Sequence, residues 1–223
     1  ARDSVEDLGQ WANIAASNVG IVVVPSDPQD GGPWFSPDGV EWTLIEGLQL
    51  SPLALTASNE RFLATDEDGG VVSSTDGTNW QTVEDLPAAD FHLVAATPFG
   101  FYAAQDTSIW RSPDGVEWTQ LPTPSLDGRV ISIAGTQTGL VAVTVIPDPR
   151  EVRFWHTTEG TVWTELQGLP QDAGCAQVSA SESGFFAITF IDDSSPDGSS
   201  AAWFSEDGRR WARVATGPGR LAV

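Results

Sequence analysis

The sequence predicts an all-β protein, a β-propeller of four-stranded antiparallel blades with five blades visible in the chain. Three observations carry this prediction. One tryptophan-rich segment recurs five times within 223 residues, two β-rich runs precede each copy, and no segment keeps an apolar period of about 3.6 residues. Four-stranded units that repeat every ~40–45 residues are typical of propeller blades. An all-β sandwich is the competing architecture, but it does not account for five copies of one hairpin.

The recurring segment follows the pattern W-x-[ST]-x-[DE]-G-x-x-W. Its copies begin at Trp34, Val72, Trp110, Trp155 and Trp203, and the copy at Val72 is the least similar. An Asp-Gly step between apolar runs favours a tight β-turn, because glycine adopts positive φ without steric cost. Each copy therefore predicts the hairpin of the third and fourth strands of a blade. Nine of the ten tryptophans belong to these copies, and only Trp11 lies outside them.

Two further strands precede each hairpin. The first is a short run of small and aliphatic residues that ends at Ser17, Ser58, Thr97, Thr136 and Ser181. The second is a β-rich run at 21–24, 62–64, 101–104, 140–145 and 185–190. A small residue precedes the end of every first run, which fits the crowded innermost strand of a blade.

We expect one propeller domain over residues 1–223, with blades at approximately 11–47, 48–87, 88–124, 125–170 and 171–216. Residues 1–10 and 219–223 resemble parts of adjacent blades, an outer strand and an inner strand respectively. We therefore expect five whole blades of a longer propeller, or a further incomplete blade, and a closed five-blade ring is the competing expectation. An alternative for the first residues is a capping box, Ser4 with Asp7, that opens a short helix.

Charge and composition exclude several classes of function. The chain has 31 acidic and 10 basic residues, a net charge of −21, so binding to nucleic acid or to an anionic membrane surface is disfavoured. One cysteine excludes an internal disulfide framework and a cysteine-rich zinc site. No run approaches the roughly twenty apolar residues of a membrane span, so we expect no direct membrane insertion within this chain.

The hairpins resemble Asp-box (BNR-type) repeats of sialidases, sortilin-like receptors and photosystem II assembly factors. They resemble still more the S-P-D-G-x-x-W blades of uncharacterised secreted or lipid-anchored actinobacterial proteins. This sequence lacks the residue that usually separates Asp from Gly in the Asp-box. The resemblance implies an extracellular or cell-envelope location and a structural role for the motif. The acidic residues that would then accept backbone N–H bonds in their own turns are Asp38, Asp76, Asp114, Glu159 and Asp207.

The sequence predicts no catalytic residues. A sialidase needs an arginine cluster and a tyrosine nucleophile, but the arginine-bearing signature is absent and the only tyrosine, Tyr102, lies in a predicted second strand. His92 and His156 are far apart in sequence, so they indicate no zinc site. Cys175 is interpreted as a small buried apolar residue.

Acidic residues gather in the loops between second and third strands and in the links between blades, which share one face of a propeller. The candidate binding face comprises residues at the tops of inner strands and in these loops, namely Gln10, Ser51, Asp90, Arg129, Asp66, Asp68, Asp192 and Asp193. Three interpretations stay open: an acidic rim that aids solubility, recognition of a cationic partner, or weak Ca²⁺ binding at a loop such as Asp66 and Asp68. No other cofactor or metal is expected.

The sequence thus favours a non-catalytic binding or scaffold propeller of a secreted or envelope-anchored protein. The partner would be a protein or a glycan, or further blades or domains of the same protein, and not nucleic acid. One alternative is a sialidase-like glycoside hydrolase with active residues partly outside this chain. Another is a structural spacer module.

Overall fold

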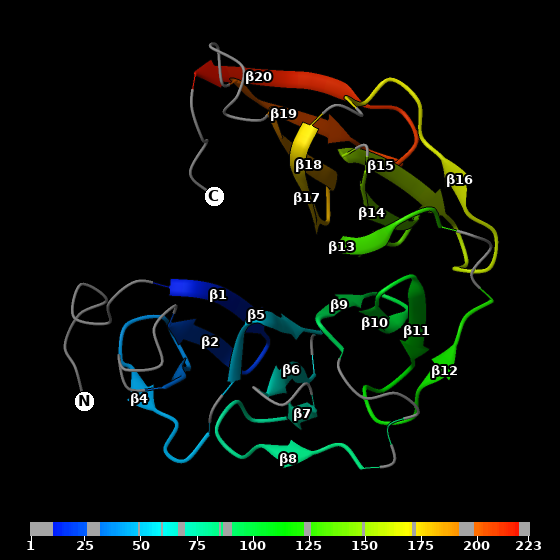
Figure 1. Ribbon diagram of the computed structural model, residues 1–223. Coiled ribbons are helices and arrows are strands. Elements are labelled where there is room, and N and C mark those ends of the chain that lie inside the picture. Colours follow the sequence, from blue (N-terminus) through cyan, green and yellow to red (C-terminus); the bar gives the residue numbers. More distant parts are fainter. Residues whose placement is uncertain are drawn as a thin grey trace. The chain divides into compact units, whose positions relative to one another are not determined.

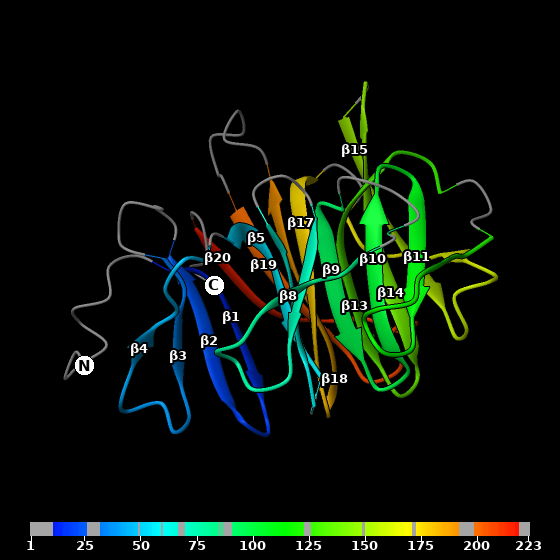
Figure 2. The ribbon, with the colours of Figure 1, turned by 90° about the horizontal axis from the view of Figure 1, so that it is seen from below.

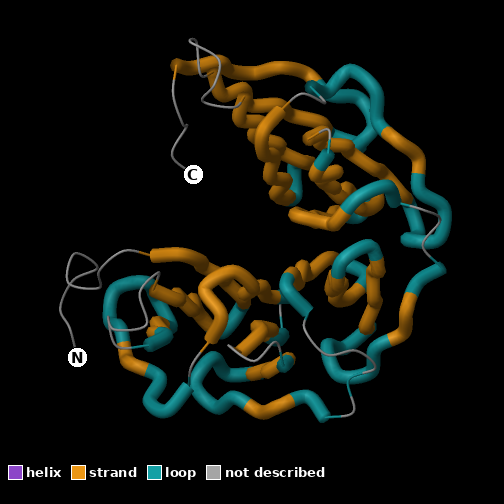
Figure 3. The backbone as a smooth tube through the Cα atoms, viewed as in Figure 1, coloured by secondary structure: helices purple, strands orange, loops and turns teal. Residues whose placement is uncertain are grey.

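The computed structural model describes residues 11–25, 32–48, 50–58, 60–66, 70–84, 86, 91–122, 126–148, 150–170, 173–191 and 199–218. These residues form twenty β-strands and include no helix (Figure 3). It follows that this part of the chain has no helix able to span a membrane. Residues 1–10 and 219–223, which carry the expectation of adjacent blades and the alternative of a short helix, lie outside the described residues.

The strands form five four-stranded sheets, each in sequence order. The bounds in the first three sheets are β1 (Trp11–Ser17), β2 (Gly20–Pro25), β3 (Trp34–Ser36), β4 (Thr43–Leu44); β5 (Leu50–Ala57), β6 (Phe62–Asp66), β7 (Val71–Ser74), β8 (Gln81–Thr82); β9 (Leu93–Thr97), β10 (Gly100–Gln105), β11 (Ser108–Ser112), β12 (Thr119–Gln120). Those in the last two are β13 (Arg129–Thr136), β14 (Gly139–Pro147), β15 (Arg150–Thr157), β16 (Thr164–Glu165); β17 (Ala173–Ser181), β18 (Gly184–Ile191), β19 (Ser199–Ser205), β20 (Ala212–Pro218). Figure 1 shows β17 to β20 side by side. The predicted fold class, an all-β propeller of four-stranded antiparallel blades, is confirmed, and we number the sheets blade 1 to blade 5.

The chain divides into two compact units. The first comprises Ala1–Ala104 and Trp110–Thr119, and the second comprises Gln105–Ile109 and Gln120–Val223. Blades 1 and 2 belong to the first unit and blades 4 and 5 to the second.

Apolar side chains from consecutive blades form the core of each unit. In the first unit, Val22 of blade 1 joins Leu55 and Phe62 of blade 2 in one buried cluster. In the second unit, Val141 and Phe154 of blade 4 join Phe185 of blade 5. Burial of each such side chain contributes about 1.5–3 kcal/mol relative to exposure. The blades are therefore held together mainly by the contacts between their faces.

Hydroxyl groups link neighbouring innermost strands, which share no β-ladder. Thr56 Oγ1 on β5 accepts a hydrogen bond from the Ala96 N–H on β9, at 2.8 Å. Ser132 Oγ on β13 accepts from the Val178 N–H on β17, at 3.1 Å. These bonds satisfy backbone groups that would otherwise be buried without a partner.

The turn glycines of blades 2, 3 and 5, which are Gly77, Gly115 and Gly208, fit against the preceding blade. A Cβ added to Gly77 of blade 2 would lie 2.4 Å from the ring of Phe35 in blade 1. A Cβ on Gly208 of blade 5 would lie 2.8 Å from His156 and 3.0 Å from Val141 in blade 4. Glycine at this position thus serves two needs at once, positive φ in the turn and close approach between blades.

Candidate functional site

The hairpin turn of blade 2 shows how the repeated motif works. Ser74 Oγ accepts the Gly77 N–H at 2.9 Å and donates to Asp76 Oδ1 at 3.1 Å. The same Asp76 oxygen accepts the N–H groups of Thr78 and Asn79, at 2.9 and 2.7 Å. The amide side chain and then the backbone N–H of Asn79 hold the pKa of Asp76 well below its ordinary value. The carboxylate is thus engaged in organising its own turn.

The turns of blades 1, 3 and 5 repeat this arrangement. Asp38 Oδ1 accepts the N–H of Val40 at 2.8 Å, Asp114 Oδ1 that of Val116 at 2.9 Å, and Asp207 Oδ1 that of Arg209 at 2.8 Å. The pKa of each of these carboxyl groups is lowered, chiefly by a backbone N–H donated within the turn, from Val40, Val116 and Arg210 respectively.

In blade 4, Glu159 occupies the position that an aspartate holds in the turns of the other blades. Thr157 Oγ1 still accepts the Gly160 N–H, at 2.9 Å. Among the contacts that the structure describes, the Glu159 carboxylate accepts no N–H of its turn, so the expectation that it would do so is not met. We attribute this difference to the extra methylene, which makes glutamate longer than aspartate.

The second tryptophan of the motif also stabilises the turn in three blades. The indole N–H groups of Trp80, Trp163 and Trp211 donate to the carbonyls of Gly77, Gly160 and Gly208, each at 3.1 Å. Carboxylates and indoles of the motif are therefore largely used within the blades, and a functional surface has to come from other residues.

The candidate binding face is only partly described. Arg129 is exposed at the start of β13, where it pairs with Val145 of β14. Ser51 and Asp66 lie on β5 and β6, but their side chains are outside the described set. Gln10, Asp68, Asp90, Asp192 and Asp193 also lie outside the described residues. The binding face and the Ca²⁺ site at Asp66 and Asp68 therefore stay predictions.

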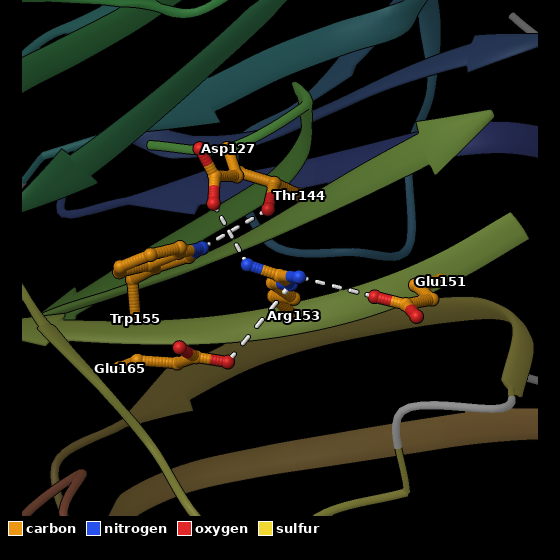
Figure 4. Close-up of polar contacts among 6 residues, drawn as sticks. All are labelled: Asp127, Thr144, Glu151, Arg153, Trp155 and Glu165. Atoms are coloured by element: carbon orange, nitrogen blue, oxygen red, sulfur yellow. Dashed lines mark hydrogen bonds and ion pairs between the residues drawn. The ribbon is translucent and has the colours of Figure 1, made fainter. Parts of the chain in front are cut away.

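A cluster of charged side chains lies on blade 4 (Figure 4). Arg153 on β15 donates to Asp127 Oδ2 at 2.8 Å and to Glu151 Oε2 at 3.1 Å, and its Nε lies 4.0 Å from Glu165 Oε1. These carboxylates come from the link before β13, from β15 itself and from β16. The hydrogen bond that Arg153 donates to Glu151 first, and then the charges of the neighbouring carboxylates, raise the pKa of Arg153. Three negative charges around one positive charge leave the cluster at −2.

The cluster lies on an extended hairpin. The ladder between β14 and β15 continues to the pair of Pro147 with Arg150. It therefore extends beyond Val145 of β14, which pairs with Arg129 at the start of β13. Figure 2 shows the end of this hairpin projecting past β13. Asp148 and Arg150 are exposed at the tip. The corresponding connection in blade 3 is short, since only Asp106 and Thr107 separate β10 from β11.

Tyr102, Arg61 and His156 are of the residue types that sialidase-like or zinc chemistry would use, and the structure places all three in the blades. Tyr102 lies on β10, as expected, with 2 % of its surface exposed, and burial raises the pKa of its hydroxyl. Arg61 donates to Ser73 Oγ at 3.0 Å within its own blade. His156 lies buried on β15, and its Nδ1 accepts a hydrogen bond from Arg209 Nε of blade 5 at 3.4 Å. Among the described residues, no group of three or more histidine, cysteine, aspartate or glutamate side chains could hold a metal ion.

Sequence reasoning missed two features of the second unit. One is the Arg153 cluster, whose members are separated by up to 38 positions, from Asp127 to Glu165, and share no motif. The other is the contact of His156 with Arg209, which joins a strand of one blade to the turn of the next. The one signal that could have located this contact is that Arg209 follows the turn glycine of blade 5.

Comparisons with known proteins agree on the fold alone. No model of a known protein family matches the chain, and neither does any curated protein. Among solved structures, YCF48 bound to D1 peptide matches 92 % of this chain and 66 % of its own, with a TM-score of 0.59 and 13 % identity. An ancestral GH74 enzyme matches 92 % of this chain and 32 % of its own, with a TM-score of 0.56 and 12 % identity. A nidogen/laminin complex contains a chain that matches 89 % of this one and 75 % of its own, with a TM-score of 0.54 and 13 % identity.

These structures are β-propellers. The chain spans less than two thirds of the first two. The same fold thus serves proteins that bind partners and a protein that is an enzyme, so function has to be argued from this chain's own surface.

Proposed function

We propose that this protein is a non-catalytic binding or scaffold propeller that contacts a cationic protein partner through charged loops at one end of its blades. The observation that carries the proposal is the extended β14–β15 hairpin with its Arg153 cluster. Support comes from three properties of this hairpin: the fold does not require it, its side chains are held in place, and it is exposed at its tip.

The blade fold does not require the extension. A turn as short as Asp106–Thr107 is sufficient to connect the second and third strands of blade 3. In blade 4 the ladder continues to Pro147 and Arg150, with Ile146 opposite Glu151. Residues that add no contact to the core of a blade are the ones available to a partner.

Arg153 fixes the geometry of the hairpin's base. Its hydrogen bonds to Asp127 and Glu151 tie the link before β13 to β15, so two carboxylates of different segments are held in one orientation. Exposed ion pairs contribute little to stability, in general about 0–1 kcal/mol. Fixed carboxylates do favour binding, because less side-chain freedom is lost when a partner binds. A residual charge of −2 attracts a cationic partner and speeds its association.

The proposed partner class is supported by the charge of the whole chain, and the proposed location by the resemblance of its hairpins. A net charge of −21 disfavours nucleic acid and favours basic protein surfaces. Two of the structures with this fold, YCF48 with its D1 peptide and the nidogen/laminin complex, are propellers in complexes with other polypeptides. The resemblance of the hairpins to Asp-box and S-P-D-G-x-x-W repeats supports an extracellular or cell-envelope location, where a glycan partner is the alternative.

The proposal is tested with short arginine- and lysine-rich peptides by fluorescence anisotropy. We expect binding that weakens with salt and that falls several-fold in the double variant Asp148→Asn, Glu151→Gln. Glu182→Gln is the matched control, because Glu182 is an exposed acid on the β17–β18 turn. An equal loss in the control would show unspecific attraction to a negative protein and would overturn the proposed surface.

The enzyme alternative has its own test. Tyr102, the only tyrosine, is 2 % exposed, which disfavours a tyrosine nucleophile within this chain. A panel of fluorogenic sialosides and other glycosides is expected to give no turnover above the buffer rate. Turnover that is lost in Tyr102→Phe would replace the proposed binding function by the hydrolase.

Calcium is a separate proposal and rests on the sequence of the 66–68 loop. Millimolar Ca²⁺ is expected to raise the melting temperature of the protein, and Asp68→Asn is expected to remove this shift. An unchanged melting temperature would end the calcium proposal and leave the binding proposal intact.

A further inference from the structure

The chain contains several Asp–Gly steps, at which an aspartate can rearrange without an enzyme. The glycine nitrogen attacks Cγ of the aspartate, a C–N bond forms, and the carboxyl OH leaves with the amide hydrogen as water, which gives a cyclic succinimide. Water then opens the ring at either carbonyl, and one product is isoaspartate, in which the backbone runs through the former side chain. Glycine favours the reaction because it has no side chain to restrict its backbone. The steps among the described residues are at Asp38, Asp76, Asp114, Asp127 and Asp207, and those outside them are at Asp30, Asp68 and Asp197.

The hairpin turns of blades 1 to 3 hold both reacting groups of their Asp–Gly step in hydrogen bonds. The N–H groups of Gly39, Gly77 and Gly115 donate to the hydroxyl of the serine three residues earlier, at 2.8, 2.9 and 2.7 Å. The carboxylate of each preceding aspartate accepts the two backbone N–H groups that follow the glycine. The pKa of each of these carboxyl groups is lowered, so the uncharged acid that the nitrogen attacks is rare. These turns therefore hinder the rearrangement.

Asp127 and Gly128 lie in the link before β13, outside any hairpin turn. The Asp127 carboxylate accepts a hydrogen bond from Arg153 at 2.8 Å (Figure 4). Among the contacts that the structure describes, no backbone N–H donates to this carboxylate, and the Gly128 N–H has no acceptor. The rearrangement at Asp127 thus has to break only the contact with a single side chain.

An isoaspartate at position 127 does not fit the present contacts. The backbone before Gly128 becomes one carbon longer, and the free carboxylate moves onto Cα, one carbon nearer to the backbone. Gly128 has no room toward β14, because a Cβ added to it would lie 2.4 Å from the Val145 carbonyl oxygen and 3.1 Å from Ile146 Cγ1. We therefore expect the carboxylate to leave Arg153.

We propose that Asp127–Gly128 is a site of spontaneous isoaspartate formation, and that this modification releases the link before β13 from Arg153. The matching steps in the turns of blades 1 to 3 are protected by their own hydrogen bonds. Loss of the Asp127 contact frees Arg153 and takes one fixed carboxylate from the cluster, so the affinity for a cationic partner falls as the protein ages. This last consequence rests on the proposed function, whereas the modification itself does not.

Ageing of the whole chain at neutral pH and physiological temperature tests the modification. Peptide mapping by mass spectrometry with electron-transfer fragmentation distinguishes isoaspartate from aspartate and follows each step separately. We expect isoaspartate at position 127 to accumulate at least several-fold faster than at the aspartates of the turns in blades 1 to 3. Equal or slower accumulation at position 127 overturns the proposal.

Two controls separate the effect of the fold from that of the neighbouring residues. In guanidinium chloride the unfolded chain is expected to form isoaspartate at similar rates at these steps, and a difference as large as in the folded chain would overturn the protection by the turns. Ser74→Ala removes the acceptor of the Gly77 N–H. In the folded variant we expect faster isoaspartate formation at Asp76 and an unchanged rate at Asp127. No gain at Asp76, in a variant that keeps the β-sheet circular dichroism of the unaltered chain, would overturn the protective role of the serine.

The effect on binding is measured on the same aged protein. A column of immobilised arginine- and lysine-rich peptide is expected to retain a fraction that is several-fold depleted of isoaspartate at position 127 relative to the fraction that flows through. Equal contents in the two fractions would overturn the effect on affinity. If fresh protein is not retained at all, the proposed binding function fails, and the isoaspartate map still decides whether Asp127 is modified.

Discussion

Val141 in blade 4 and Phe186 in blade 5 hold the same position in the same kind of strand, yet one is a core residue and the other a surface residue. Val141 is 0 % exposed and Phe186 is 40 % exposed. Both follow the first glycine of their strand by two residues, and both pair with the residue after the first tryptophan of the motif. Val141 is covered by the neighbouring blade 5, whose turn glycine Gly208 lies against it. In a repeat protein, burial is therefore a property of the contact between repeats as much as of the repeat itself.

The largest expected effect is the difference in stability between a variant with a charge at Val141 and one with a charge at Phe186. Val141→Asp places an unpaired carboxylate in an apolar contact and is expected to lower the free energy of unfolding by about 3 kcal/mol or more. Phe186→Asp is expected to change it by less than about 1 kcal/mol, since an exposed position can hydrate the charge. Urea denaturation of the two variants measures the difference. Equal losses would contradict the exposed state of Phe186.

Turn glycines allow a second comparison, between Gly77 and Gly39. Their φ values are +80° and +81°, so an alanine at either site is strained by the same amount, about 1–2 kcal/mol. Only at Gly77 does the new Cβ meet a neighbouring blade, 2.4 Å from the ring of Phe35, which adds about 1–3 kcal/mol. Gly77→Ala is therefore expected to melt at a lower temperature than Gly39→Ala. Identical melting temperatures would mean that the turn of blade 2 does not press on blade 1.

The repeated motif made the fold and the turn chemistry predictable. Two tryptophans around an Asp-Gly turn act within ten residues, so a local pattern carries the hairpin and the hydrogen bonds of Asp38, Asp76, Asp114 and Asp207. The pattern did not predict the turn of blade 4 correctly, because Glu159, one methylene longer than aspartate, makes none of these hydrogen bonds among the contacts that the structure describes.

Contacts between distant segments were not predictable. The Arg153 cluster joins a link, β15 and β16, and nothing in the local sequence of Asp127 or Glu165 marks them as neighbours. Phe186 and Val141 are both apolar residues in β-rich runs, and alternation alone cannot tell which of them is covered. Sequence periodicity reports the two faces of a strand and says nothing of what packs on each face.

The burial of His156 between blade 4 and blade 5 makes the stability of this contact depend on pH. Burial first, and then the charge of Arg209, lower the pKa of His156 below its ordinary value, against a smaller opposing effect of Asp207. The folded protein then binds fewer protons than the unfolded chain just below pH 6.5. The stabilisation is therefore complete above pH 6.5 and decreases as the pH falls toward the folded pKa, with a slope of at most about 1.4 kcal/mol per pH unit.

His156→Phe tests this dependence. Phe35 holds the same position in blade 1 against a turn glycine, so a phenylalanine fits this kind of contact. Between pH 7 and 5, part of the decrease in the stability of the unaltered protein comes from His156. We expect the stability of the variant to decrease less over this range, as measured by chemical denaturation at each pH. An unchanged slope in the variant would assign the pH dependence to other groups.

The smallest expected effect compares an aspartate that organises its turn with a glutamate that does not. Asp76→Ala removes the acceptor of the Thr78 and Asn79 N–H groups and is expected to lower the free energy of unfolding by about 1 kcal/mol, as the loss of a helix cap does. Glu159→Ala, at the same position of blade 4, is expected to have almost no effect. Both values come from urea denaturation at pH 7, where Asp76 is charged in the folded and in the unfolded chain. Below the ordinary pKa of an aspartate the gap between the two variants should narrow, because the unfolded chain then takes up a proton at Asp76 while the folded turn, in which the pKa of Asp76 is lowered, keeps its charge. A loss in Glu159→Ala equal to that in Asp76→Ala would mean that the extra methylene is accommodated and that the turn of blade 4 uses its carboxylate after all.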